Sequence, residues 1–386
     1  TATAIVLTEA VLGTSTPTVD PTRLTLPPPE TLVLRTDTPT PEATALPERA
    51  FPLPPLEEFA GNTLVAWGGQ DVSGDGYLPI RLYSIDQGDN FTLLDSVNVE
   101  NVDINPANGA SLIYTRYFNL TFSVDIERSN LNGNQAQLLS DLWRPLSSIF
   151  EPQHVQFSNN GTHVVFTGFS TETNTRQVYM VDFTAPPAPN QTPLRQLTDD
   201  NTNWSFPSVS PDGTTVVAVR VDENSANPAP DLWTIDTASL TLTQLTQDGD
   251  DLVESTSRFA PDGQSIVYVA SERSADAPGD MIRLPLAPGG LAVPVIRSPE
   301  IDERFPVFST DGRWLAYASD RTGVHNIYFK NIETDTDYQY TAEQLDPVFP
   351  GGWYQPGIVP EIPAVVPLPT PVIVEVEEGG DNEGDS

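Results

Sequence analysis

The side chains that most often perform acid–base, nucleophilic or metal chemistry are few in this sequence. It contains three histidines, His154, His163 and His325, and no cysteine. Without a thiol, cysteine catalysis, disulfides and cysteine-ligated zinc are excluded. The histidines do not share a motif, so we expect each to be a structural or surface residue rather than part of a metal site or a catalytic triad.

One short segment has the spacing of a calcium loop. Asp71, Ser73 and Asp75 place oxygen ligands at alternate positions ahead of Gly76, as in the opening of an EF-hand loop. The position that would hold the bidentate glutamate is Leu82, and Asp/Gly-rich turns are also common between strands. The segment is therefore a candidate calcium site, with an ordinary turn as the alternative, and we expect no other cofactor.

The elements that would position any site are indicated by an internal repeat. A turn of the Ser-Pro-Asp-Gly type recurs, and its glycines are spaced by 52, 52, 50 and 49 residues, which is near the length of a propeller blade. In such a turn proline presets φ, aspartate bonds nearby N–H groups and glycine adopts the left-handed conformation. The five glycines are Gly109, Gly161, Gly213, Gly263 and Gly312, and Gly61 ends a degenerate earlier copy.

Each of these glycines precedes an apolar run, and further short runs complete each repeat. In the copy that follows Gly213, the runs are Val216–Val219, Leu232–Asp236 and Gln244–Thr246. With the strand before the turn, each repeat holds four short strands, which is the content of one propeller blade. The sequence therefore predicts an all-β fold, a six-bladed β-propeller with four-stranded blades.

These repeats resemble those of the TolB-like (WD40-like) propellers. The resemblance is carried by Pro-x-Phe-Ser-Pro-Asp-Gly, an apolar strand, a Leu-Tyr-x-x-Asp strand and Leu-Thr, and the best copies begin at Phe206, Phe259 and Phe305. It covers about 300 residues and implies a fold more than a function, because this family serves many tasks. The same propellers also resemble the lid of prolyl oligopeptidase-type hydrolases, but this sequence lacks the Gly-x-Ser-x-Gly elbow of their catalytic domain.

The C-terminal end of the repeat region predicts how the ring closes. Pro347-Val348-Phe349 echoes Pro306-Val307-Phe308 at an offset of 41 residues, and no second strand follows it. We interpret it as the innermost strand of blade 1, since closure of this kind removes exposed strand edges. The expected organisation is a Thr/Pro-rich extended arm over residues 1–55, the propeller over 56–355, and a Pro-rich, then acidic tail over 356–386 with a possible strand at 372–377.

Acidic residues recur in the links between blades, which meet on one face of a propeller. We expect them to form an acidic rim for a basic partner or a cation, with a solvated turn as the alternative reading. Arg258 and Arg304, near the innermost strands, would offset this charge near the channel. The predicted rim consists of Asp199, Asp200, Asp248, Asp250, Asp251, Glu300, Asp302 and Glu303.

Composition limits the partners. The formal net charge is −35, so the chain repels phosphate backbones and we expect no nucleic-acid partner. No apolar run is long enough for a transmembrane helix. The chain starts at Thr1 instead of methionine, so we expect a processed or trimmed end. Together with the TolB-like resemblance, this predicts an exported bacterial protein that is extracellular, on the cell surface or periplasmic.

Both ends carry strand-forming segments that could join neighbouring subunits. The segments are Ile5, Val6 and Leu7 near the start and Val372, Ile373 and Val374 near the end. Strand addition through such arms would build a filament or surface assembly from copies of the chain. This is our second hypothesis.

The first hypothesis is a non-enzymatic module that binds a protein or another ligand. A carboxylate-based glycosidase or lyase is a third reading, but acidic pairs are too numerous to single one out. The sequence therefore predicts that the protein is not an enzyme.

Overall fold

The structure is a computed structural model of the 386-residue chain. It describes residues 51–68, 79–94, 98–118, 123–131, 136–139, 149–184, 193–223, 230–246, 252–272, 277–287, 290–298, 300–344 and 347–358. The candidate calcium residues Asp71, Ser73 and Asp75 and the candidate strands at both ends lie outside these ranges.

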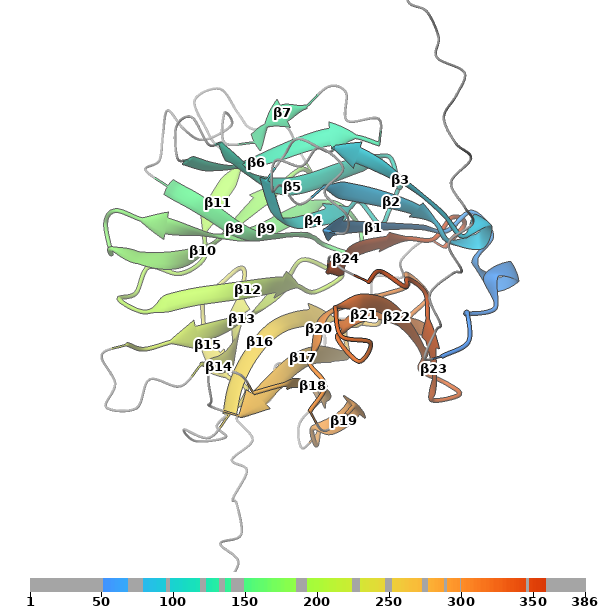
Figure 1. Cartoon of the computed structure of the whole chain (residues 1–386). Coiled ribbons are helices and arrows are strands. Elements are labelled where there is room, and N and C mark those ends of the chain that lie inside the picture. Colours follow the sequence, from blue (N-terminus) through green and yellow to red (C-terminus); the bar gives the residue numbers. More distant parts are fainter. Residues whose placement is uncertain are drawn as a thin grey trace, which may run out of the picture. The chain divides into compact units, whose positions relative to one another are not determined.

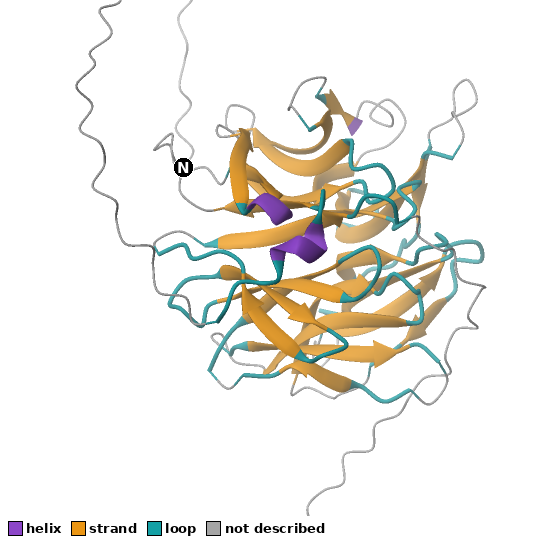
Figure 2. Ribbon diagram, turned by 90° about the vertical axis from the view of Figure 1, so that its right-hand side faces the viewer, coloured by secondary structure: helices purple, strands orange, loops and turns teal. Residues whose placement is uncertain are grey.

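The described residues form six four-stranded antiparallel sheets, as the repeat predicts (Figure 1). Within the described ranges, helix is limited to short segments such as the 3-10 turns η1 (Leu56–Phe59) and η2 (Ile85–Gln87) (Figure 2). We number the sheets as blades 1 to 6 in chain order. Blade 1 is β24 (Val348–Tyr354), β1 (Thr63–Gly68), β2 (Ile80–Ser84) and β3 (Asp89–Leu94); blade 2 is β4 (Asn98–Ile104), β5 (Ser111–Phe118), β6 (Ser123–Asn130) and β7 (Gln137–Leu138); blade 3 is β8 (Ile149–Phe157), β9 (His163–Ser170), β10 (Thr175–Asp182) and β11 (Leu194–Gln196).

The later blades repeat the same order of strands. Blade 4 is β12 (Asn203–Val209), β13 (Thr215–Val221), β14 (Asp231–Asp236) and β15 (Leu242–Gln244); blade 5 is β16 (Leu252–Phe259), β17 (Ser265–Glu272), β18 (Gly279–Pro285) and β19 (Val293–Ile296); blade 6 is β20 (Glu303–Phe308), β21 (Trp314–Ser319), β22 (Asn326–Asn331) and β23 (Thr336–Gln339). The innermost strands contact one another in the order β24, β4, β8, β12, β16 and β20, and β20 returns to β24. The ring is therefore closed.

The recurring turns join the first and second strands of the blades. In blade 4, Gly213 has a φ of 76° and donates its N–H to Ser210 O at 2.9 Å. Asp212 Oδ1 accepts from Thr214 N at 3.0 Å and from the Ser210 hydroxyl at 2.6 Å. Burial alone would raise the pKa of Asp212, but these hydrogen bonds outweigh it and hold the pKa below its usual value. The predicted turn chemistry is confirmed.

The C-terminal strand closes blade 1, as predicted, but in a different register. Trp353 faces Leu64 across the β24–β1 pair in the way that Phe308 faces Leu315 in blade 6. This corresponds to an offset of 45 residues, and the offset of 41 was wrong. Pairing with β1 sets the register of β24, and in this pairing Gly351 is bulged and has no partner.

Two glycines allow β24 to approach β4 of blade 2. A Cβ on Gly351 would lie 2.1 Å from Val102 O, and a Cβ on Gly352 would lie 2.0 Å from Asp103 Oδ1. Neither position leaves room for a side chain. The last strand can therefore enter the ring only because these two residues are glycines.

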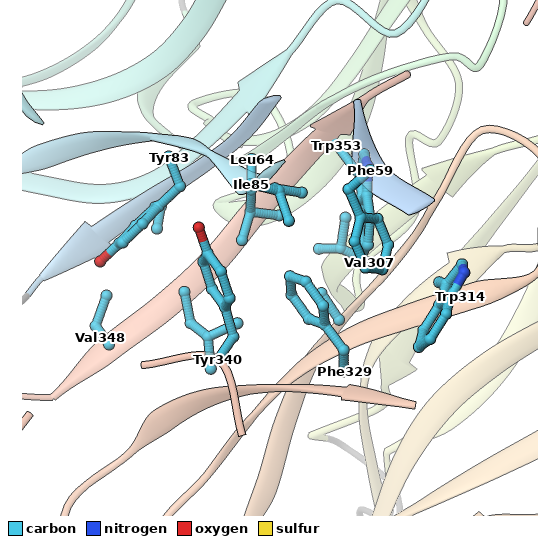
Figure 3. Close-up of a cluster of buried hydrophobic side chains, with 13 residues drawn as sticks. Phe59, Leu64, Tyr83, Ile85, Val307, Trp314, Phe329, Tyr340, Val348 and Trp353 are labelled. Carbon is cyan, nitrogen blue, oxygen red and sulfur yellow. The ribbon is translucent and has the colours of Figure 1, made fainter. Parts of the chain in front are cut away.

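The degenerate first copy of the repeat, around Leu56–Phe59, is displaced from the sheet as η1. Phe59 from this turn is buried between blades 6 and 1, with its ring centroid 4.9 Å from that of Trp314 and 5.7 Å from that of Trp353 (Figure 3). The Trp353 indole also donates to Asn62 Oδ1 at 2.8 Å. Aromatic packing and this hydrogen bond hold the junction where the two chain ends of the ring meet.

Candidate functional site

The innermost strands are interrupted by bulges near the middle of the ring. In blades 4, 5 and 6 the pairing skips two residues, and the first of these has a left-handed backbone: φ is 47° at Phe206, 38° at Thr256 and 56° at Phe305. In blade 3, where the pairing is doubly interrupted, His154 has a φ of 54°. Such conformations cost about 1–3 kcal/mol each for residues other than glycine. Bulges of this kind re-aim side chains and are common at functional sites.

The bulges surround a cavity of about 230 Å³, the central pocket, to which every blade contributes. It is smaller than the roughly 300–1,000 Å³ pockets that take drug-sized ligands, so it suits a group of about one ring. Its wall residues, one from each blade in order, are Trp67, Asn101, His154, Phe206, Thr256 and Phe305.

Aromatic side chains form two walls of the central pocket. Trp67 of blade 1 meets Phe305 of blade 6 edge to face, with ring centroids 4.9 Å apart. His154 of blade 3 lies against Phe206 of blade 4 at 4.0 Å. In a ring of six, blades 1 and 6 face blades 4 and 3. The two aromatic walls therefore stand on opposite sides.

The floor of the central pocket is an ion pair that spans the ring. Arg258 of blade 5 places Nη1 3.2 Å from Asp103 Oδ2 of blade 2, and its Nη2 donates to Gly351 O at 2.5 Å. Asp103 also accepts from Phe157 N at 2.9 Å. The Gln156 amide, oriented to donate to Ser208 Oγ at 2.8 Å, accepts from Arg258 at 2.6 Å. Arg258 lines both the central pocket and a small cavity of about 20 Å³ beyond it, so it separates the two.

The central pocket carries little net charge. Arg258 is the one charged residue among those that line it, and it is paired with Asp103. Burial, reinforced by the nearby Arg176, lowers the pKa of His154 to about 3, so this imidazole is neutral at pH 7. The central pocket is thus close to neutral in a chain whose net charge is −35.

No family model matches the sequence, and no curated protein does either. Among solved structures, TolB from Acinetobacter baumannii superposes with a TM-score of 0.56 at 15% identity, over 76% of this chain and 67% of that one. A putative TolB from Agrobacterium tumefaciens gives 0.52 at 14%, over 75% and 91%. An oligogalacturonate lyase in complex with manganese gives 0.50 at 15%, over 73% and 74%.

The chain has a TolB-like six-bladed propeller fold. The resemblance seen in the repeats is thus confirmed. At these identities the likeness establishes the fold alone.

The prediction that the protein is not an enzyme was wrong. It rested on the missing hydrolase domain and on the lack of a distinctive carboxylate pair. The fold of this TolB-like propeller is nevertheless shared by an oligogalacturonate lyase, and the match covers 74% of the lyase chain. A propeller of this kind can therefore make up most of the chain of an enzyme. The lack of a second domain does not exclude catalysis.

The acidic residues predicted for the rim of the TolB-like propeller are partly engaged with their own chain. Asp200 accepts from Arg220 at 3.1 Å and from the Trp204 indole at 3.0 Å. Asp302 pairs with Arg304 and lies 3.1 Å from His325 Nε2. Asp199 and Glu300 are exposed, whereas Glu303 is fully buried beside Arg321; Asp248, Asp250 and Asp251 lie outside the described ranges.

The three histidines do not converge. His154 lines the central pocket, His163 lies 3.7 Å from Asp182, and His325 contacts Asp302. Within the ranges that the structure describes, no three His, Cys, Asp or Glu side chains gather as metal ligands would. None of the helices in those ranges is long and apolar enough to cross a membrane.

Two cavities were missed by the sequence reasoning. The sequence contains one indication of the central pocket: the dipeptide Phe-Pro recurs in the inner strands, at Phe206, Phe305 and Phe349. The other cavity, of about 320 Å³, lies between blades 5 and 6 and is lined by Lys330, the chain's single lysine. Lys330 faces Leu315 at a position that is Leu284 in blade 5, and it pairs with Asp335 at 2.6 Å.

Proposed function

We propose that the protein is a binding module that takes its ligand, or one projecting group of a protein partner, into the central pocket. The observation that carries this proposal is the pair of opposed aromatic walls, Trp67–Phe305 and His154–Phe206, above a closed floor. Small, mostly apolar cavities with a few polar groups are the usual form of ligand sites.

The backbone supports the same reading. Four wall residues are held in left-handed conformations that cost stability. Closure of the ring alone does not require these left-handed conformations. A binding site does require side chains held in fixed directions toward its ligand, and bulges provide this. The Arg258–Asp103 pair beneath the pocket keeps the floor in place.

The setting we propose is outside the cytoplasm of a bacterium, at the cell surface or in the periplasm. The TolB-like fold and the Thr/Pro-rich arm are consistent with an exported protein. The net charge of −35 favours a protein or an uncharged ligand over nucleic acid.

Fluorine NMR of the full chain labelled with fluorotryptophan tests this function. The chain has six tryptophans, and Trp67 alone among the described ones lines the central pocket. The probes are methyl pyranosides, uronates, tyrosinamide and short peptides. We expect at least one probe to move the Trp67 signal and not those of Trp233 or Trp353. If every probe leaves Trp67 unmoved, the proposal fails.

A pocket-filling variant sharpens the test. Asn101→Phe adds a ring at the wall of the central pocket and should abolish the response of Trp67. Asn108→Phe, on an exposed turn, is the matched control and should leave the response intact. Equal responses in both variants would mean that the probe binds elsewhere.

A second candidate function, a structural subunit linked by its arms, is favoured by one contact. Pro52 O accepts from Gln339 N at 3.0 Å, so the end of the predicted N-terminal arm lies on the outer edge of blade 6. This edge can therefore accept extended chain. Sedimentation of the full chain and of residues 51–358 tests the idea, because identical assembly of the two would contradict it.

A further inference from the structure

The cavity of about 320 Å³ between blades 5 and 6, here called the lysine cavity, shares no lining residue with the central pocket. Its volume lies at the lower end of the roughly 300–1,000 Å³ that is usual for small-molecule sites. Much of its wall is apolar and includes Val267, Val295, Phe308 and Ile332. The lysine cavity is therefore a second place where this propeller can hold a ligand with an apolar body.

The lysine for which the cavity is named stands where no other blade has a charged residue. Lys330 on β22 is buried, and it faces Leu315, the third residue after the turn glycine Gly312. The propeller fold thus does not require a cation at this position. The residues at the matching position of blades 1 to 5 are Tyr83, Ser129, Val181, Ile235 and Leu284.

A second cation enters the lysine cavity from the opposite blade. Arg283 on β18 is partly buried, and its Nε donates to Ser265 Oγ at 3.0 Å. It is the one described arginine of blades 5 and 6 that forms no ion pair, although acidic residues outnumber basic ones by 53 to 18 in this chain. Two like charges that line one cavity repel each other, and an anion between them removes that repulsion.

The carboxylates around the lysine cavity leave room for such an anion. Asp311 already accepts from Ser309 Oγ at 2.6 Å and from Gln355 Nε2 at 2.9 Å. Asp262 is exposed and accepts from a backbone N–H of its own turn. Asp335, which is paired with Lys330 at 2.6 Å, has a side chain that is 84% exposed. Because an ion pair with so exposed a partner is weak, a ligand carboxylate can take the place of Asp335.

We infer that the lysine cavity is a second binding site, for a small organic acid whose carboxylate lies between Arg283 and Lys330 and whose apolar body packs on Val267 and Phe308. The planar guanidinium group suits a carboxylate, which it can bind through two parallel hydrogen bonds. A phosphate dianion fits less well, because it would meet the carboxylates at the mouth with about twice the charge. This inference goes beyond the proposed function, since it concerns a different cavity.

NMR of the full chain labelled with ¹³C-lysine tests the inference, because Lys330 is the only lysine and gives a single side-chain signal. The probes are phenylacetate and hexanoate, their neutral amides phenylacetamide and hexanamide, and inorganic phosphate. We expect both carboxylates to move the Cε–H signal of Lys330 to saturation. The amides and phosphate should bind at least about tenfold more weakly, because they lack either the charge or the apolar body.

Three variants keep Lys330 as the reporter. Arg283→Met should weaken the binding of phenylacetate by at least about tenfold. Asp335→Asn removes the competing carboxylate and should tighten binding by about two- to fivefold. Arg297→Met is the matched control: it removes the same charge from blade 5, but Arg297 is 72% exposed and does not line the cavity, so the affinity should not change.

Several results would overturn the inference. They are an unmoved Lys330 signal, amides or phosphate that bind as tightly as phenylacetate, and equal weakening by Arg283→Met and Arg297→Met. Weaker binding to Asp335→Asn would also contradict it, because the carboxylate of Asp335 would then assist the ligand. The Trp67 signal decides the proposed function separately. If phenylacetate moves Trp67 and leaves Lys330 unmoved, the inference fails while the proposed function stands.

Discussion

The Arg258 guanidinium and the Asp103 carboxylate lie 3.2 Å apart and join blade 5 to blade 2 across the middle of the ring. The side chain of Asp103 is 6% exposed and that of Arg258 17%. The pair holds opposite blades together and also closes the central pocket. Stability and site geometry thus depend on the same contact.

Removing one member of this pair should be costly. Arg258→Gln leaves the Asp103 carboxylate buried without its counter-ion, and we expect the free energy of unfolding to fall by about 3–5 kcal/mol. Adding Asp103→Asn should recover part of the loss. Urea unfolding of the two single variants and the double variant measures this coupling. Arg297→Gln, which breaks the exposed pair with Asp280, is the control and should cost about 1 kcal/mol or less. Additive losses in the double variant would contradict the account.

The closure of the ring should depend on Gly351. Gly351→Ala puts a Cβ against Val102 O, and we expect a loss of more than about 3 kcal/mol together with faster proteolysis of β24. Gly323→Ala is the control, because Gly323 has a φ of 96° but nothing within 4 Å of the added Cβ. It should cost about 1–2 kcal/mol through backbone strain alone. Equal losses would show that the approach of β24 to β4 does not limit closure.

The strain in the pocket wall should be measurable as stability. Thr256 has a left-handed φ of 38°, which asparagine tolerates better than a β-branched residue. We expect Thr256→Asn to raise the free energy of unfolding by about 1 kcal/mol. Thr215→Asn, in a regular strand, should lower it. If both substitutions destabilise equally in urea, the left-handed conformation carries no strain.

Glu303 should make stability depend on pH. Burial raises the pKa of Glu303 from 4.5 to about 7 in the folded protein, although Arg321 opposes the shift. At a pH between these two pKa values, the folded state keeps a proton on Glu303 that the unfolded state has released. The free energy of unfolding that this bound proton contributes is therefore lost as the pH rises from about 5 to about 8. The urea midpoint of Glu303→Gln should therefore fall less over this range than that of the unaltered protein. Glu300→Gln, at an exposed carboxylate, should follow the unaltered protein, and parallel curves for all three would refute the assignment.

The fold was readable from the sequence because local chemistry sets it. Turn glycines such as Gly213 need a left-handed backbone, and their spacing counts the blades. The central pocket was not readable, because the left-handed conformation of Phe206 comes from a bulge that exists only once β12 pairs with β13. The partner of Asp200 is Arg220, which the same pairing brings close. Such contacts depend on register, which a repeat spacing does not specify.

A crystal structure of the full chain soaked with a probe that moves the Trp67 signal tests the central claim most directly. The account predicts density for the probe between the Trp67–Phe305 wall and the His154–Phe206 wall. Density in the cavity beside Lys330 instead, with the central pocket unchanged, would contradict it.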